Sequence, residues 1–158
     1  MGLSMMRMPE EALREGFDAV VRRFEEAESA SADGTGGVPA GTFCDLGEEA
    51  WSLRAALTPA TGAETAENVT DGGRFLGDDE LGTACAYLTS GEVAGAAGAL
   101  AAIDVRSVLA ASDPSVFGIR GSLPPGYLDS VREQAEELVE FFTAAAKAGE
   151  CVVKRIEE

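Results

Sequence analysis

The stretch LGTACAYLTSGEVAGAAGALAAI, residues 81–103, decides how the middle of the chain folds. Its apolar run Thr83–Leu88 is typical of a strand that ends at Thr89. Thr89, followed three residues later by Glu92, forms a capping box, in which each side chain satisfies a free backbone N–H at the start of a helix. Apolar residues at helical spacing then predict a helix over residues 90–103, with a buried stripe of Val93, Ala96, Ala97, Leu100 and Ile103.

The same helix contains Gly91, Gly95 and Gly98. Each glycine lowers the stability of a helix by roughly 1 kcal/mol relative to alanine. We therefore expect these glycines to mark a close contact with a neighbouring helix, in the same chain or in a second one.

Further elements are predicted before this stretch. Asp45 and Glu48 form a second capping-box pattern, which predicts a helix from Asp45 to about Leu57. The remaining elements on this side are a strand at Gly2–Met8, a helix from Pro9 that buries Leu13, Phe17, Val20 and Phe24, and a short strand at 73–77.

After the stretch, the periodicity predicts a short helix at 105–110 and a long helix with an apolar stripe from Leu128 to Ala145. Gly149 is a natural C-cap for that helix, and residues 151–156 are typical of a closing strand. Three segments predict loops: a mobile surface loop at 28–41, a polar loop at 58–71 and a Gly/Pro-rich connection at 118–126.

This order of elements predicts one α+β domain over residues 1–158. We expect a small mixed or antiparallel sheet packed with about four to five helices. The first and last strands are candidates for the centre of the sheet, but the sequence leaves the strand order open.

The composition excludes several kinds of chemistry. The chain has no histidine, which removes Ser-His-Asp and Cys-His mechanisms and the commonest zinc ligand. Its formal net charge of −16 disfavours binding to nucleic acid, because the phosphate backbone is itself negative. The charge otherwise serves solubility or attracts a basic partner protein.

Three cysteines, Cys44, Cys85 and Cys151, lie far apart and form no C-x-x-C pair. Their odd number and apolar neighbours predict reduced, buried thiols in a cytoplasmic protein. No apolar run is long enough to predict a membrane span, and the N-terminal residues lack the pattern of a secretory signal.

Candidate site residues fall into three groups, each with a structural alternative. Asp78, Asp79 and Glu80 form the densest acidic run, which is either a cation ligand set completed by Asp71 or Asp45 or a solvated turn. An aromatic pair with a nearby arginine either lines a small-molecule pocket or packs in the core: Trp51 and Tyr87, with Arg54 or Arg74. Acidic residues of the last helix either meet a basic partner or form a solvated face: Glu133, Glu136, Glu137 and Glu140.

The chain resembles the YfbM-like family of small bacterial proteins of unknown function. The resemblance rests on four places in order: Met1-Gly2 with Arg7 before a Pro-Glu-Glu helix, the segment 46–57 with Trp51, the segment 81–100, and the end from Phe141-Phe142 through Gly149 to Val152-Val153. In the family the tryptophan is usually followed by histidine, whereas Ser52 stands here. The resemblance implies a compact α+β fold and brings no reaction, cofactor or metal with it.

Two functions remain open from the sequence. The first is a non-enzymatic cytoplasmic module that recognises a protein partner through an acidic surface, with Trp51, Arg54, Asp78, Asp79 and Tyr87 as candidate surface residues. The second is a carboxylate-based enzyme, or a binder of a small ligand or metal, that uses the Trp51 and Tyr87 region. A convergent pocket would favour the second function, and a flat or convex acidic face the first. A structural role without any ligand also stays open, and no catalytic, cofactor or metal residue is assigned.

Overall fold

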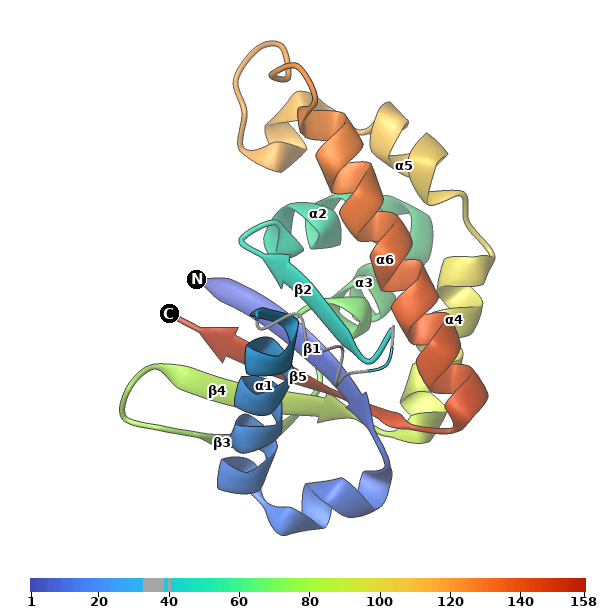
Figure 1. Ribbon diagram of the computed structural model, residues 1–158. Coiled ribbons are helices and arrows are strands. Elements are labelled where there is room, and N and C mark those ends of the chain that lie inside the picture. Colours follow the sequence, from blue (N-terminus) through green and yellow to red (C-terminus); the bar gives the residue numbers. More distant parts are fainter. Residues whose placement is uncertain (33–38, 40) are drawn as a thin grey trace.

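The computed structural model describes residues 1–32, 39 and 41–158. Five strands form one sheet in the order β2-β1-β5-β4-β3, and every neighbouring pair is antiparallel (Figure 1). The strands are β1 (Gly2–Met8), β2 (Phe43–Gly47), β3 (Arg74–Asp78), β4 (Thr83–Leu88) and β5 (Cys151–Glu157). The prediction of an α+β fold is confirmed. Of the two predicted kinds of sheet, mixed or antiparallel, the structure has the antiparallel one.

The two ends of the chain meet at the centre of the sheet. Strand β5 lies between β1 and β4, with Leu3 opposite Ile156 on one side and Leu88 opposite Val152 on the other. Residues 151–155 of β5 are all buried, as expected for a central strand covered on both faces. Strand β5 therefore joins β1 to the β3–β4 hairpin.

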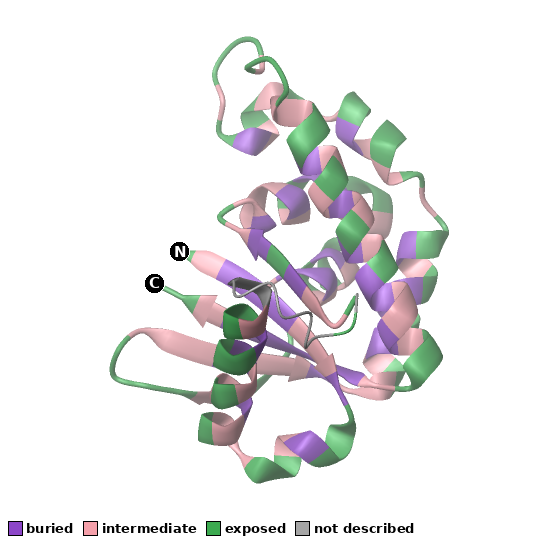
Figure 2. Ribbon diagram, viewed as in Figure 1, coloured by how far each residue is buried: buried purple, intermediate pink, exposed green. Residues whose placement is uncertain are grey.

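Helices cover the two faces of the sheet unequally. Side chains alternate between faces along a strand, so the adjacent Val152 and Val153 point to opposite sides. Val153 belongs to a small cluster with Phe24 of helix α1 (Phe17–Ala32), whereas Val152 belongs to the main core. That core is built by helices α2 (Ala50–Thr61), α3 (Ala63–Val69), α4 (Ser90–Ala101), α5 (Val105–Ala111) and α6 (Tyr127–Ala148) (Figure 2).

The signals at helix ends predicted α4 and α6 well. The Thr89–Glu92 capping box is present at the start of α4, and Gly149 ends α6 in the left-handed conformation with a φ of 65°. The strands predicted at the start, middle and end of the chain are also present, as is α5.

The helix predicted from Pro9 is broken in two. A 3-10 helix, η1 (Glu10–Glu15), precedes α1, and Gly16 separates them with a φ of 91°. Helix α1 continues to Ala32, so the loop predicted at 28–41 was wrong at its start. The centre of that predicted loop lies outside the described residues.

The helix predicted from Asp45 to about Leu57 is present as α2, but its predicted start was wrong. Residues 43–47 form β2, because Cys44 and Leu46 alternate into the core, and Asp45 Oδ1 instead accepts a hydrogen bond from the Gly47 N–H at 2.9 Å. Helix α2 begins later, at Ala50, and the polar loop predicted at 58–71 is largely helical. Gly62, with a φ of 89°, separates the end of α2 from α3. A second 3-10 helix, η2 (Pro114–Phe117), precedes α6.

Among the described residues, nothing makes the close contact predicted at the α4 glycines. Gly91, Gly95 and Gly98 are exposed, and a Cβ atom added to any of them would meet nothing within 4 Å. The apolar stripe of α4 faces the core, and the glycines lie on its solvent side.

Among the described helices, no single one is long and apolar enough to cross a membrane. Helices α4 and α5 reach that length and composition only as a pair, which is bent by 67°.

Two glycine substitutions should change stability in opposite directions. Gly98→Ala should raise the free energy of unfolding by about 0.5–1 kcal/mol, because alanine favours helix and the site is open. Gly77→Ala should lower the free energy of unfolding by about 1–3 kcal/mol, because its Cβ would lie 2.9 Å from Phe17 Cβ. Urea denaturation of both variants measures the effects, and a destabilised Gly98→Ala would contradict an open α4 face.

Candidate functional site

The structure keeps Trp51 and Tyr87 apart. Trp51, on α2, packs against the main core. Tyr87, on β4, packs against the small cluster beneath α1 on the opposite face of the sheet. A pocket lined by both aromatic rings therefore does not form, and each ring has a packing role of its own.

The two arginines considered as anion ligands are each paired with a carboxylate. Arg54 Nη1 donates to both oxygens of Asp71 at 3.0 and 2.9 Å, and Arg74 Nε donates to Glu92 Oε1 at 3.0 Å. This hydrogen bond from Arg74 to Glu92 is the main cause of the raised pKa of Arg74. Arg74 does lie beside Tyr87, its partner across the β3–β4 pair.

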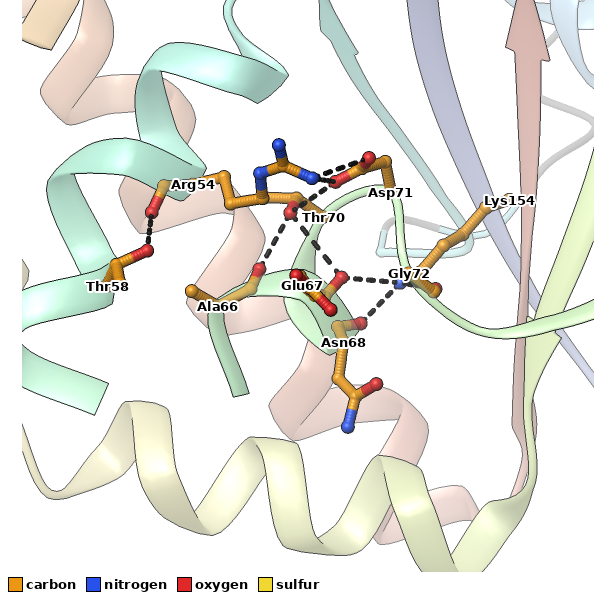
Figure 3. A network of polar contacts seen from close by, with 9 residues as sticks. All are labelled: Arg54, Thr58, Ala66, Glu67, Asn68, Thr70, Asp71, Gly72 and Lys154. Carbon is orange, nitrogen blue, oxygen red and sulfur yellow. Dashed lines mark hydrogen bonds and ion pairs between the residues drawn. The ribbon is translucent and has the colours of Figure 1, made fainter. Parts of the chain in front are cut away.

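A buried lysine that the sequence analysis missed is the centre of a polar network (Figure 3). Lys154 of β5 is 0% exposed, and its Nζ donates to the backbone carbonyls of Glu67, Asn68 and Gly72. Glu67 and Asn68 belong to the last turn of α3, where a helix leaves carbonyl groups without partners in its own backbone ladder, and Gly72 lies just beyond the end of the helix. The lysine therefore caps α3 and ties it to the central strand.

Neighbouring groups complete this network. Thr70 Oγ1 donates to Ala66 O at 2.7 Å and contacts Asp71 Oδ1 at 3.1 Å, and Asp71 also binds Arg54 of α2. Gly72 has to be glycine, because a Cβ there would lie 2.8 Å from the Glu67 carbonyl. The network thus joins α2, α3 and β5 through charge and backbone contacts.

The geometry around Lys154 fits an ammonium group, whose three N–H donors match three carbonyl acceptors. Burial is the main influence on the pKa of Lys154 and lowers it to about 7, while Asp71 and Glu92 oppose the change. A shifted lysine is often a catalytic group, but this side chain has no exposed surface and its donors are occupied. We assign it to stability. Its one sequence signal is a lysine within the apolar strand CVVKRIE.

The acidic run Asp78–Asp79–Glu80 forms the turn between β3 and β4. Asp79 Oδ1 accepts hydrogen bonds from the N–H groups of Leu81 and Thr83, both at 2.9 Å, and hydrogen bonding to the Thr83 backbone is the main cause of its lowered pKa. Asp78 and Glu80 are exposed. Among the described residues, no three Asp, Glu or Cys side chains converge as a metal site, Asp71 and Asp45 included.

The C-terminus adds acidic residues at the same end of the sheet. Glu157 lies opposite Thr83, and the Glu158 N–H donates to Gly82 O at 3.1 Å. Asp79 also accepts a hydrogen bond from the Thr83 N–H, so Thr83 joins the acidic turn to the strand that carries Glu157.

This acidic end also exposes large apolar side chains. Leu81 is 91% exposed and Phe75 is 69% exposed. Phe75 pairs with Ala86, and Ala84 pairs with Ile156, so half-buried apolar residues continue across the strands. We name this region the hairpin surface and define it as Phe75, Asp78, Asp79, Glu80, Leu81, Ala84, Ala86, Ile156 and Glu158.

A second acidic region lies along α6. Glu133, Glu137 and Glu140 are exposed, whereas Glu136 pairs with Arg106 of α5. Beside them, an open groove of about 470 Å³ between the α4–α5 corner and α6 has a floor of Leu100, Ile103, Val105 and Val139. The groove contains neither Trp51 nor Tyr87.

The three cysteines are buried, as predicted, and each is a free thiol in the structure. Burial raises the pKa of Cys44 to about 12 and that of Cys85 and Cys151 to about 11. The Cys151 Sγ donates to Met8 O at 3.1 Å, and acidic rather than basic neighbours raise its pKa further. None of these sites favours a reactive thiolate.

Comparison with known proteins gives a family and a fold. The sequence matches the family described as "Domain of unknown function (DUF1877)" over residues 10–154. No functionally curated protein matches. The fold is similar to the crystal structure of YfbM, a protein of unknown function from Escherichia coli, with a TM-score of 0.62 over 99% of both chains at 15% sequence identity.

Lys154 should make the free energy of unfolding rise with pH near neutrality. The pKa of Lys154 is about 7 in the folded protein, whereas its ordinary value, which applies to the unfolded chain, is 10.5. Between pH 7 and 10.5 the unfolded state therefore binds more protons than the folded state. Because the chain has no histidine, no other side chain has its ordinary pKa between pH 6.5 and 8. From pH 6.5 to 8 we expect a gain of roughly 1 kcal/mol, below the range where the buried thiols act in the opposite direction.

Urea denaturation at several pH values tests this expectation. Lys154→Met should remove the rise, and Lys147→Met, at an exposed position on α6, should retain it. A flat profile for the wild-type protein would contradict the assignment even if Lys154→Met does not fold.

The folded protein should react very slowly with a thiol reagent such as DTNB at pH 8. Burial both shields the thiols and keeps them protonated. We expect all three to react once guanidinium unfolds the chain, at the rate of N-acetylcysteine in the same buffer. Rapid labelling of the native protein would show that a cysteine is accessible.

Proposed function

The chain belongs to the DUF1877 family, and from its surface we propose that it is a non-enzymatic cytoplasmic module that recognises a basic protein partner through the hairpin surface. The observation that carries the proposal is the exposure of Phe75 and Leu81 among carboxylates. Fully burying a side chain of this kind contributes about 1.5–3 kcal/mol, so a partner that covered both would gain substantially. Exposed apolar groups rimmed by charge are typical of interaction sites.

The charges of this region select the kind of partner. Asp78, Asp79, Glu80, Glu157 and Glu158 lie around the turn and the chain end. Two described cations lie near this region, and each is already paired with a carboxylate. Arg155 is 4% exposed and pairs with Glu28 and Glu157, and Arg74, which precedes Phe75 on β3, pairs with Glu92. A basic segment would be attracted, and the net charge of −16 would speed its association.

The alternative, a carboxylate-based enzyme or small-ligand site in the Trp51 and Tyr87 region, has less support. These two rings lie on opposite faces of the sheet, and Arg54 and Arg74 already bind carboxylates. The α6 region is the stronger rival for a partner, because its glutamates flank an apolar groove. The large apolar residues that line this groove are buried or half-buried, whereas Phe75 and Leu81 of the hairpin surface are exposed.

A peptide-display selection tests the proposal. Random twelve-residue peptides selected on the protein should be rich in Lys and Arg with a bulky apolar residue, and their binding should weaken as salt screens the charges. Asp78→Lys combined with Glu80→Lys should reduce the affinity at least tenfold, because both carboxylates are exposed and form none of the turn's hydrogen bonds.

The matched control is Glu133→Lys combined with Glu140→Lys, which makes the same change of net charge on α6. It should retain most of the binding. Equal losses in the two double variants, or selected peptides without basic residues, would contradict recognition by the hairpin surface.

A further inference from the structure

Strand β3 is an edge of the sheet. Its one neighbour among the described strands is β4, so the outer side of its backbone has no strand partner there. An open edge is a template for an added strand. The sequence of β3, RFLGD, contains no proline, and its two charged residues, Arg74 and Asp78, stand at its ends.

The opposite edge is less open. Strand β2 pairs with β1 on one side and contacts α6, and β3 likewise contacts α1. Two residues of β2, Cys44 and Leu46, are buried, whereas no residue of β3 is buried. The two edges therefore differ in cover, and β3 is the more accessible one.

A bulge in β3 determines which side chains an added strand would meet. Phe75 pairs with Ala86 and Asp78 with Ala84, and the register shifts between Phe75 and Gly77. Ala84 and Ala86 are two residues apart, so they share one face of the sheet. The bulge thus places Phe75 and Asp78 on that same face, although they are three positions apart in sequence.

A matching strand must present an apolar residue beside Phe75 and a basic residue beside Asp78, two positions apart on one face. Aromatic–aliphatic pairs and opposite-charge pairs across neighbouring strands stabilise a sheet. A second copy of this chain fits less well, because it brings the same acidic turn and another charge of −16 to the contact.

We propose that the partner adds an extended basic segment to the β3 edge, as a sixth strand of the sheet. This inference rests on the proposed function and specifies how the hairpin surface binds. Backbone hydrogen bonds to β3 would provide affinity, and Phe75 and Asp78 would select the sequence.

A synthetic peptide, TKTITKT, has its Ile and both Lys residues on one face of a strand and is the probe. Two controls keep its charge: TKITTKT, which places Ile on the face opposite Lys, and TKTITKT with every backbone nitrogen methylated. We expect each control to bind at least tenfold more weakly in an NMR titration. We also expect TKTITKT to slow amide exchange in residues 74–78 and not in β2.

The outcomes separate the two proposals. If the methylated peptide binds as tightly as TKTITKT, or if amides of β3 are not protected, strand addition is wrong while recognition by the hairpin surface stands. If display-selected basic peptides bind the hairpin surface but TKTITKT does not, strand addition is also wrong. If no basic peptide binds, both proposals fail.

Discussion

The rest of the structure depends on the position of β5 at the centre of the sheet. This strand closes the sheet between β1 and β4, and its two central charged residues serve opposite layers. Lys154 caps α3 on one face, whereas Arg155 lies 5.0 Å from the ring centroid of Phe24 and pairs with Glu28 of α1 on the other. Buried charges are costly unless paired, so both residues constrain where their helices can lie.

This arrangement leaves one end of the sheet, at the β3–β4 turn, outside the packed core. Helices α2, α3, α4 and α6 bury the main core beside β1, β5 and the end of β4, and α1 covers the opposite face. The β3–β4 turn and the C-terminus extend beyond this cover, which leaves Phe75 and Leu81 in solvent. The central strand can hold this end of the sheet in one geometry without burying it. Binding by the proposed hairpin surface would require such a fixed geometry.

The comparison with YfbM shows how little identity this architecture needs. The two folds agree over 99% of both chains at 15% identity. A sheet with covered faces needs apolar residues at alternate positions and helices of the right length, and many sequences meet these conditions. Family membership therefore establishes the fold, and a proposal about function has to come from surface residues of this particular chain.

The sequence by itself determined the elements whose signals are local. The capping box at Thr89, the long stripe of α6 with Gly149 and the apolar closing strand all specify structure through neighbours within a few residues. The same local reasoning was wrong at Asp45, because the burial of Leu46 in β2 outweighs a capping pattern.

Only the tertiary structure decided the strand order, the role of Lys154, the separation of Trp51 from Tyr87 and the bulge that aligns Phe75 with Asp78. Each of these depends on which distant segments pair and in which register. A pairing between residues 2–8 and 151–157 leaves no periodic mark in either segment. The chemistry of the site follows from that pairing, which is why the sequence predicted the acidic residues and not the surface they form.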